Sequence, residues 1–469
     1  MSSSSTVEHR VDLRDRAVDG DGAEKLLGSR IEEWKQSPEW HDWRWQLRNS
    51  VRSIDEVERL LGIRFEAKKR AKLELTLRRF PLAITPHYLS LVARDQALVN
   101  TGESGYTLAK LWYDPVFRQA FPSTAELEVR ADEHSDPLAE ESDSPVPLLT
   151  HRYPDRVLFH VSHQCAMYCR HCTRKRKVGD PRRAPAKDEY AAAFEYIRRN
   201  PEVRDVLVSG GDPLMLSDAR LESILKELRS IPHVEVIRIG TRVPVVLPQR
   251  VTPELVAMLR RYHPLWINTH FNHSQEICPD SERAVAMLAD AGIPLGNQSV
   301  LLAGVNDCVR VMRRLVQDLV RMRIRPYYLY QCDLSEGLAH FRTRVGKGIE
   351  IIESLLGHTS GFAVPTYVID APDGGGKIAC MPNYLVSWST NKVVLRNYEG
   401  VMCTYPEPEG YQEPRCAKAC DDCHLQMPEH SVEVDSIGVA RLLDDADELR
   451  VLVPQGCERV ARREDEEAS

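Results

Sequence analysis

Short apolar runs alternate with longer amphipathic stretches through the middle of the chain. The apolar runs predict strands at residues 157–162, 206–209, 234–240, 265–269, 294–302, 326–331 and 366–369. The stretches between them predict helices at residues 189–198, 219–231, 253–261, 281–291, 309–322 and 348–356. Short strands that alternate with helices of this length are typical of βα units around a parallel sheet. The pattern therefore predicts an α/β fold with a full or partial barrel.

The pattern changes on both sides of this region. The preceding stretch is helical, with tryptophans among charges, and an acidic stretch with Pro and Ser follows it, as in a linker or a surface-wrapping segment. Beyond the barrel we expect one more strand, at residues 392–397. We expect a disordered N-terminus (residues 1–23), a helical region (24–130) and an acidic linker (131–150). A barrel (151–380), a C-terminal extension (381–455) and a charged tail (456–469) follow.

Composition excludes several classes of protein. The chain has 469 residues, 42% hydrophobic and 28% charged, with a formal net charge of -7. This mild acidity argues against a surface that coats nucleic acid. A basic run at residues 174–177, next to a cysteine cluster, suggests anionic ligands instead. There is no apolar stretch long enough to span a membrane and no secretory signal, so we expect a cytoplasmic protein.

Six of the 12 cysteines fall in two triplets with the same spacing: Cys165, Cys169, Cys172 and Cys416, Cys420, Cys423. Clustered cysteines in a long chain indicate metal binding more often than disulfides. The first triplet follows a predicted strand directly. Three thiolates can bind three irons of a [4Fe–4S] cluster, which leaves the fourth iron open. The alternative is a zinc knuckle that lacks its fourth ligand.

Other reactive residues stand at or just past predicted strand ends, where barrel enzymes keep their active sites. They are Ser209, Gly210, Gly211, Asp212, His270, Gln298 and Asp333. A further strand runs into a glycine-rich loop that presents Lys377. A lysine amine in such a loop suits Schiff-base chemistry with pyridoxal phosphate (PLP). The loop alone favours a phosphate-binding loop or an exposed lysine in a turn over PLP, although the GxxxxGK[ST] motif of a P-loop is absent.

The first triplet, in "CAMYCRHC", resembles the radical S-adenosylmethionine (SAM) superfamily. From residues 34 to 411 the chain is similar to the lysine 2,3-aminomutase family, which also uses PLP. The matching stretches include "AITPHYLSL", "DSPVPLLTHRYPDRVL", "NTHFNH", "PLGNQSVLL", "RPYYLYQCDLSEGLAHFRT" and "VIDAP" with "GGGKI". The resemblance implies a partial (βα)6-type radical SAM barrel with an N-terminal helical region and a C-terminal extension that binds PLP and zinc.

The resemblance also implies roles for individual residues. Lys377 would bind PLP covalently, and Arg152, Tyr153 and Arg156 would hold its ring and phosphate. The SAM site would use the segment from Ser209 to Asp212, together with His270 and Gln298, and Tyr330 belongs to the cofactor site. Arg174 would bind the substrate carboxylate, and Asp333 and Asp370 would bind its distal ammonium group. Zinc would be held between two subunits by Cys308, Cys416, Cys420 and Cys423.

The implied reaction is a 1,2-amino shift that converts L-lysine into β-lysine through a 5′-deoxyadenosyl radical. Arginine is the alternative substrate, because two carboxylates also bind a guanidinium and the chain departs from the family at Arg344, Asp373 and Trp388. A protein-lysyl-modifying relative, a non-catalytic scaffold and an auxiliary iron–sulfur cluster on the second triplet remain further alternatives. We expect a homodimer or homotetramer that takes electrons from flavodoxin or ferredoxin.

Overall fold

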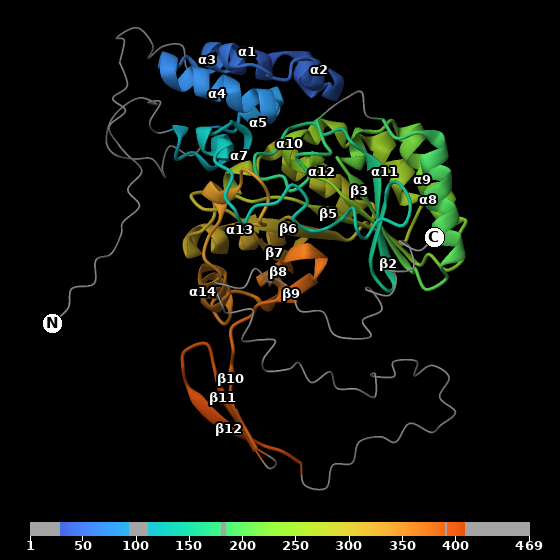
Figure 1. Ribbon diagram of the computed structural model, residues 1–469, viewed down its shortest axis with the longest axis vertical. Coiled ribbons are helices and arrows are strands. Elements are labelled where there is room, and N and C mark those ends of the chain that lie inside the picture. Colours follow the sequence, from blue (N-terminus) through green and yellow to red (C-terminus); the bar gives the residue numbers. More distant parts are fainter. Residues whose placement is uncertain (1–28, 93–110, 180–183, 390–391, 409–469) are drawn as a thin grey trace, which may run out of the picture.

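A nearly closed sheet forms the centre of the computed structural model, which describes residues 29–92, 111–179, 184–389 and 392–408 (Figure 1). Nine strands follow one another in sequence order, from β1 to β9. Strands β2 to β8 run parallel, while β1 and β9 are antiparallel additions at the two edges. The strands are β1 Leu149–Tyr153, β2 Arg156–Ser162, β3 Asp205–Gly210, β4 Val236–Gly240, β5 Leu265–Thr269, β6 Leu295–Leu301, β7 Ile324–Gln331, β8 Thr366–Ala371 and β9 Gly376–Ala379.

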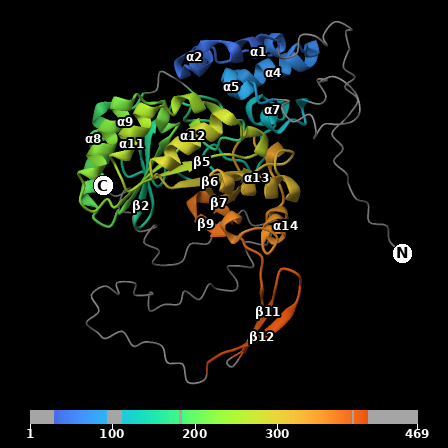
Figure 2. The same cartoon turned by 180° about the vertical axis from the view of Figure 1, so that it is seen from behind.

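Helices cover the outside of this sheet, as Figures 1 and 2 show from opposite sides. They are α8 Lys187–Arg199, α9 Asp218–Arg229, α10 Val243–Val246, α11 Pro253–Arg260, α12 Pro279–Asp290, α13 Val309–Arg321 and α14 Val345–Leu355. In α13 the buried residues are Met312, Leu315, Val316 and Leu319, which repeat at helical spacing. One apolar stripe of the helix therefore packs on the sheet.

The α/β prediction is confirmed. Each of the seven apolar runs coincides with one parallel strand, and each amphipathic stretch coincides with a helix of the outer layer, within a few residues at the ends. The two edge strands were not predicted. β1 carries mostly polar residues, and β9 has three exposed positions out of four, so neither shows the continuous apolar run of a buried parallel strand.

The N-terminal region is helical and packs on one end of the barrel (Figure 1). Its helices are α1 Ser29–Gln36, α2 Trp43–Arg48, α3 Ile54–Leu61, α4 Ala67–Arg79, α5 Pro86–Leu89 and α7 Pro115–Ala120. In α3 a capping box between Ser53 and Glu56 satisfies the first backbone N–H groups. The Thr85 hydroxyl donates to the Val246 carbonyl at 2.6 Å, which fixes α5 on the barrel.

The acidic segment, which the sequence indicates as a linker or a surface-wrapping segment, packs along the barrel. Backbone hydrogen bonds join His134 to Leu334 and Glu336, and the Glu133 carboxylate accepts from two backbone N–H groups nearby. The side chains of Glu133, Glu140 and Asp143 are buried. A buried carboxylate is stable only with hydrogen-bond donors or cations as partners, so these side chains must pair with basic residues or backbone N–H groups.

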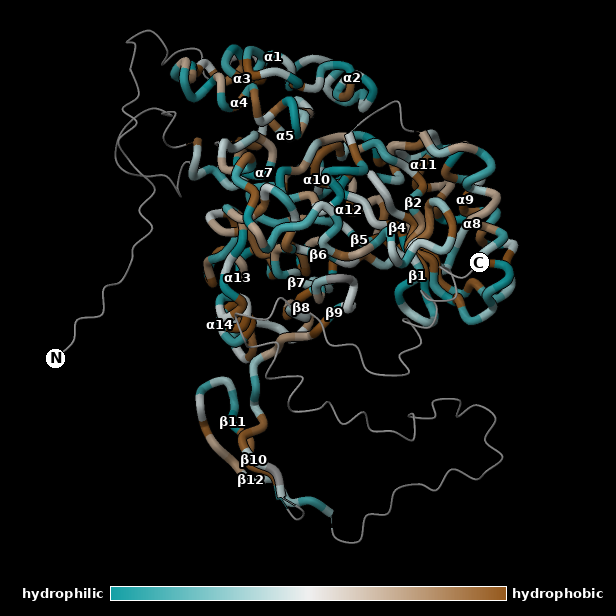
Figure 3. Tube along the Cα trace, in the orientation of Figure 1, coloured by the Kyte–Doolittle hydropathy of each residue, from teal (hydrophilic) through white to brown (hydrophobic). Residues whose placement is uncertain are grey.

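The remaining described strands form a separate three-stranded antiparallel sheet, called the arm here. It comprises β10 Leu385–Trp388, β11 Lys392–Arg396 and β12 Met402–Pro406, whereas the sequence predicted only the middle strand. Figures 1 and 3 show the arm projecting away from the barrel, with apolar positions along it. Val386, Val401, Met402 and Tyr405 are at least half exposed. No helix among the described residues is both long and apolar enough to cross a membrane.

Candidate active site

The three cysteines of the first triplet lie in the loop that follows β2, and all three are partly buried. Burial and the neighbouring thiols raise the pKa of Cys165 and Cys172, the latter to about 11. Three thiols on one loop fit a cluster that takes one thiolate on each of three irons. In the part of the chain that the structure describes, no group of three or more His, Cys, Asp or Glu side chains is placed to hold a metal ion.

Two glycines let β3 lie directly against the start of this cysteine loop. A Cβ atom on Gly210 would come within 2.4 Å of the Ser162 carbonyl oxygen, and one on Gly211 within 2.4 Å of that of Gln164. Gly210 also has a φ of 119°, which disfavours any side chain. The Asp212 amide donates to the Gln164 carbonyl at 2.7 Å. The glycines are therefore needed for close approach of the backbone.

Asp212 connects this segment to the loop after β4. Its carboxylate accepts from the Thr241 hydroxyl at 2.7 Å, the Arg242 amide at 2.8 Å and the Leu214 amide at 3.0 Å. Burial raises the pKa of this carboxyl. Asp212 thus holds the β4 loop in place. Ser209 lies near the end of β3, next to Gly240 at the end of β4. A Cβ atom added to Gly240 would lie 3.4 Å from the Ser209 hydroxyl.

Two histidine rings next to the cysteine loop have unpartnered buried nitrogens. The His171 and His270 ring centroids are 5.3 Å apart. His171 Nδ1 and His270 Nε2 are buried and have no hydrogen-bond partner. Burial and the Arg242 charge lower the pKa of both rings, that of His270 to about 3, so both are neutral. An orphaned buried polar atom points to a ligand that completes its hydrogen bonding, so these rings fit the expected SAM site.

A lysine and two carboxylates gather on β7, β8 and β9. Lys377 Nζ lies 3.1 Å from Asp370 Oδ1 and 5.5 Å from the centroid of the Tyr330 ring. Gln298 Nε2 donates to the Tyr330 hydroxyl at 3.1 Å. Burial and the Asp370 charge raise the pKa of Asp333 to about 8, against the opposing charges of Lys377 and Arg174. These residues therefore share one electrostatic environment.

Tyr153 joins the two edges of the open sheet. Its hydroxyl accepts from the Lys377 backbone amide at 3.0 Å, so the end of β1 meets β9. The Arg156 guanidinium lies over the Tyr153 ring at 4.1 Å. An amine, an aromatic ring and an exposed cation are the groups that a phosphorylated aldehyde cofactor requires, so this corner fits PLP.

Carboxylates of the acidic segment pair with two of the arginines that were predicted to bind ligands. Arg174 donates to the Glu140 carboxylate from Nε at 2.9 Å and from Nη2 at 2.6 Å. Burial opposes ionisation of Glu140, but the Arg174 charge holds its pKa well below the usual value. Arg152 donates to Asp143 at 2.8 Å and to the Leu138 carbonyl. Arg152 thus faces the acidic segment, whereas its neighbour in β1 faces Lys377.

The rest of the basic run is also paired within the chain. Lys175 lies 3.1 Å from Glu126, Arg176 lies 2.8 Å from Asp136, and Lys177 lies 3.7 Å from Glu140. That this run attracts anionic ligands stays a prediction. In the structure, carboxylates of the protein itself pair with these cations.

Sequence reasoning missed the residues that support the site. The buried Glu140 and Glu126, with Arg242 beside Cys169, belong to stretches whose local pattern gave no catalytic signal. Strand order offered one indication, because Arg242 follows β4 at the same barrel end as the other strand-end residues. The acidic residues before β1 gave no such indication in the sequence, because only the folded barrel brings them next to their arginine partners.

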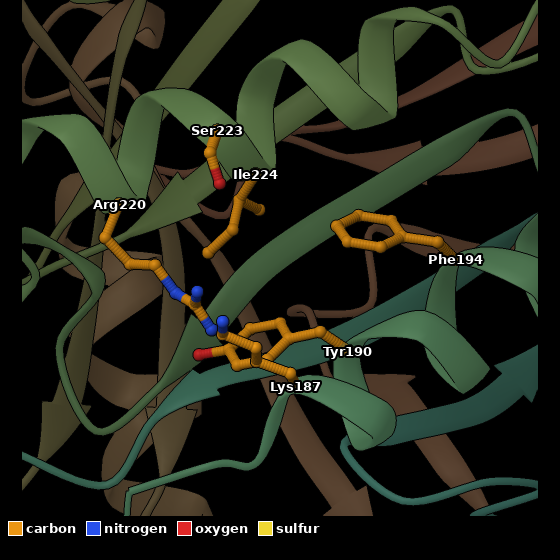
Figure 4. A pocket seen from close by; sticks show the side chains of 6 residues that line it. All are labelled: Lys187, Tyr190, Phe194, Arg220, Ser223 and Ile224. Carbon is orange, nitrogen blue, oxygen red and sulfur yellow. The ribbon is translucent and has the colours of Figure 1, made fainter.

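Other positions are not brought to this site. Cys308 is exposed at the start of α13, and Cys416, Cys420 and Cys423 lie outside the described residues. A small pocket on α8 and α9 contains no predicted site residue, and there the Arg220 guanidinium lies 4.4 Å from the centroid of the Tyr190 ring (Figure 4). The pocket is lined by Lys187, Tyr190, Phe194, Arg220, Ser223 and Ile224.

Comparison with known proteins identifies the family of this chain. The family model "Radical SAM superfamily" matches residues 159–316, and "Lysine-2,3-aminomutase" matches residues 352–469. The L-lysine 2,3-aminomutase of Methanococcus maripaludis is 54% identical over 91% of this chain and 94% of its own length. The L-lysine 2,3-aminomutase of Acetoanaerobium sticklandii is 55% identical over 90% of this chain and 96% of its own length. The glutamate 2,3-aminomutase of Clostridioides difficile is 44% identical over 77% of this chain and 82% of its own length.

These matches extend over nearly the whole chain and include the cysteine loop, the strand-end residues and the β8–β9 hairpin. The chain therefore belongs to the lysine 2,3-aminomutase family of the radical SAM superfamily.

Proposed function

We propose that the protein is an L-lysine 2,3-aminomutase, an isomerase that moves the α-amino group of L-lysine to C3 and releases β-lysine. The relatives named L-lysine 2,3-aminomutase support this, since two of them exceed 50% identity while the glutamate 2,3-aminomutase is 44% identical. The observation that carries the proposal is the pair of carboxylates, Asp333 and Asp370, in one site with Arg174 and Lys377.

The site brings together groups of both charges, which suits a diamino acid. Asp333 and Asp370 are the acidic groups, and the charge of Arg174 acts on Asp333, so this cation belongs to the same electrostatic environment. The Nε and Nη2 groups of Arg174 bind Glu140, and this fixed guanidinium can present its remaining N–H groups to a substrate carboxylate. Lysine carries a carboxylate at one end and an ammonium group at the other, so it matches both.

We assign Cys165, Cys169 and Cys172 to a [4Fe–4S] cluster, with the SAM site formed by Ser209, Gly210, Gly211, Asp212, His270 and Gln298. Lys377, Tyr153 and Arg156 would hold PLP, with Arg152 and Tyr330 in supporting positions. When bound, the cluster and SAM would supply radical chemistry able to remove hydrogen from C3, and PLP would supply an aldehyde group able to hold the amino nitrogen. The protein's own residues would orient the substrate and exclude water, and the buried His171 together with the partly buried His270 and Tyr330 supports this.

Arginine remains the second candidate substrate. Arg344, one of the departures from the family, is exposed at the start of α14, and the side chains of Asp373 and Trp388 lie outside what the structure describes. Two carboxylates can grip a guanidinium as well as an ammonium group. We prefer lysine because relatives named L-lysine 2,3-aminomutase are 54% and 55% identical over nearly the whole chain.

We further propose that Cys308 and the second triplet bind zinc between two subunits, and that flavodoxin or ferredoxin supplies the electron. The exposed apolar side chains of the arm suit burial in a homodimer or homotetramer. Metal analysis of Cys416→Ser tests the assignment, because loss of zinc with retention of iron is expected. Loss of iron alone would instead indicate an auxiliary cluster on this triplet.

Anaerobic turnover of the reconstituted, reduced protein with SAM and PLP tests the main proposal. An equimolar mixture of lysine, arginine, glutamate and alanine is offered, and β-amino acids are identified by mass spectrometry. β-Lysine as the main product is expected. β-Arginine would retain the reaction but overturn the substrate. Formation of 5′-deoxyadenosine without any β-amino acid would overturn the aminomutase and leave only the radical SAM assignment.

A further inference from the structure

Arg242 is a buried arginine that contacts one cysteine of the first triplet. It lies between β4 and α10 and is 8% exposed. Its Nη1 group donates to Cys169 Sγ at 2.8 Å. Its Nη2 group donates to Glu276 and to Gln119, both at 2.7 Å, and its Nε group donates to the His270 carbonyl at 3.2 Å. Each side of the guanidinium therefore has a specific partner.

The partners of Arg242 are themselves fixed in place. Glu276 is fully buried and also accepts from the Tyr88 hydroxyl at 2.7 Å and from the Asn272 amide at 2.6 Å. Gln119 accepts in addition from Asn272 Nδ2 at 2.9 Å. Because Tyr88 and Gln119 come from α5 and α7, the N-terminal helices complete a network that ends at the cysteine loop.

Neutralising the buried Glu276 carboxylate does not by itself explain why Arg242 also donates to Cys169. Arg250 is equally buried, and it satisfies its guanidinium with Asp218 and two backbone carbonyls. Arg242 instead directs one N–H group at a sulfur. A neutral thiol is a weak acceptor, whereas a thiolate is a strong one for a cation. The contact is therefore strongest when Cys169 is ionised, as it is when it binds iron.

We propose that Arg242 is a positioning residue for the iron–sulfur cluster, which fixes Cys169 and raises the reduction potential of the cluster through its N–H···S bond. The inference rests on the proposed function, because it assumes a [4Fe–4S] cluster on the first triplet. Hydrogen bonds to the cluster sulfurs and the local charge set such potentials. One added electron makes the cluster more negative, so a cation at one ligand favours the reduced form.

The test is a redox titration of the reconstituted protein with dithionite, in which the EPR signal of the reduced cluster is followed. Arg242→Gln removes the cation, and the double variant with Glu276→Gln removes its partner as well. Arg250→Gln is the matched control, a buried arginine without a sulfur contact. We expect a reduction equilibrium at least tenfold less favourable in both Arg242 variants, about 59 mV lower for one electron, and no change in the control.

Four outcomes decide the inference. An unchanged potential in Arg242→Gln with full iron content would overturn it. A lowered potential in the single variant that returns in the double variant would also overturn it, because an unpaired Glu276 charge would then be the cause. Loss of iron from Arg242→Gln, while Arg250→Gln retains iron and both melt at similar temperatures, would support the positioning role. Absence of a [4Fe–4S] signal from the unaltered protein would refute the proposed function itself.

Discussion

Replacement of Asp333 by Asn should change how substrate binding depends on pH. Asp333 lies just past β7, within the electrostatic influence of Asp370 and Lys377. Burial and the Asp370 charge raise its pKa to about 8, so at neutral pH the carboxyl holds a proton. A cationic side chain binds the ionised form. Loss of that proton must therefore accompany binding whenever the pH is below the pKa.

The magnitude follows from the distance between the pH and the pKa. One pH unit corresponds to about 1.36 kcal/mol, so at pH 7 ionisation of Asp333 costs about tenfold in affinity. The kcat/KM for lysine should rise about tenfold per unit up to pH 8 and then level off. Removal of one partner of a buried charge pair costs about 2–5 kcal/mol, so Asp333→Asn should lower the plateau by about 30-fold or more.

The assay is the pH profile of kcat/KM for both proteins, with Glu336→Gln as the control. Glu336 lies on the same loop, but its partner is Arg79, so its profile should match that of the unaltered protein. Thermal unfolding gives a second readout. A carboxyl whose folded pKa is raised destabilises the fold as pH rises toward 8, so Asp333→Asn should melt higher at pH 9. An identical slope below pH 8 with and without Asp333 would refute the reasoning.

Two further substitutions test the support of the site. Glu140→Gln removes the buried bidentate partner of Arg174, so KM for lysine should rise tenfold or more while kcat changes less. Glu141→Gln, at a side chain 67% exposed, should change KM by less than about threefold. Gly211→Ala places a Cβ 2.4 Å from a backbone oxygen of the cysteine loop, so reconstituted protein should hold less iron. Gly346→Ala, in open space at the start of a helix, should retain full iron and melt slightly higher.

The barrel was predictable because its signal is local. A parallel strand buried on both faces needs a continuous apolar run, and such runs marked β2 to β8 within a few residues of each end. The proximity of Asp333 and Asp370 followed from topology, since parallel strands bring their carboxyl ends to one side. The edge strands and the arm lacked this signal, because their side chains are polar or exposed.

The partners of the charged residues could not be predicted in the same way. Arg174 and Glu140 are 34 positions apart and belong to segments without apolar periodicity, yet together they form a nearly buried pair. Any arginine near the barrel mouth would have matched Glu140 equally well on the sequence alone. The folded backbone decides, because a buried carboxylate must be paired and the fold brings the Arg174 guanidinium within 2.6 Å of Glu140. The same reasoning applies to Lys175, Arg176 and Lys177, whose carboxylate partners are also far away in the sequence. Local sequence specifies where charges occur, and burial specifies which charges the protein must neutralise itself.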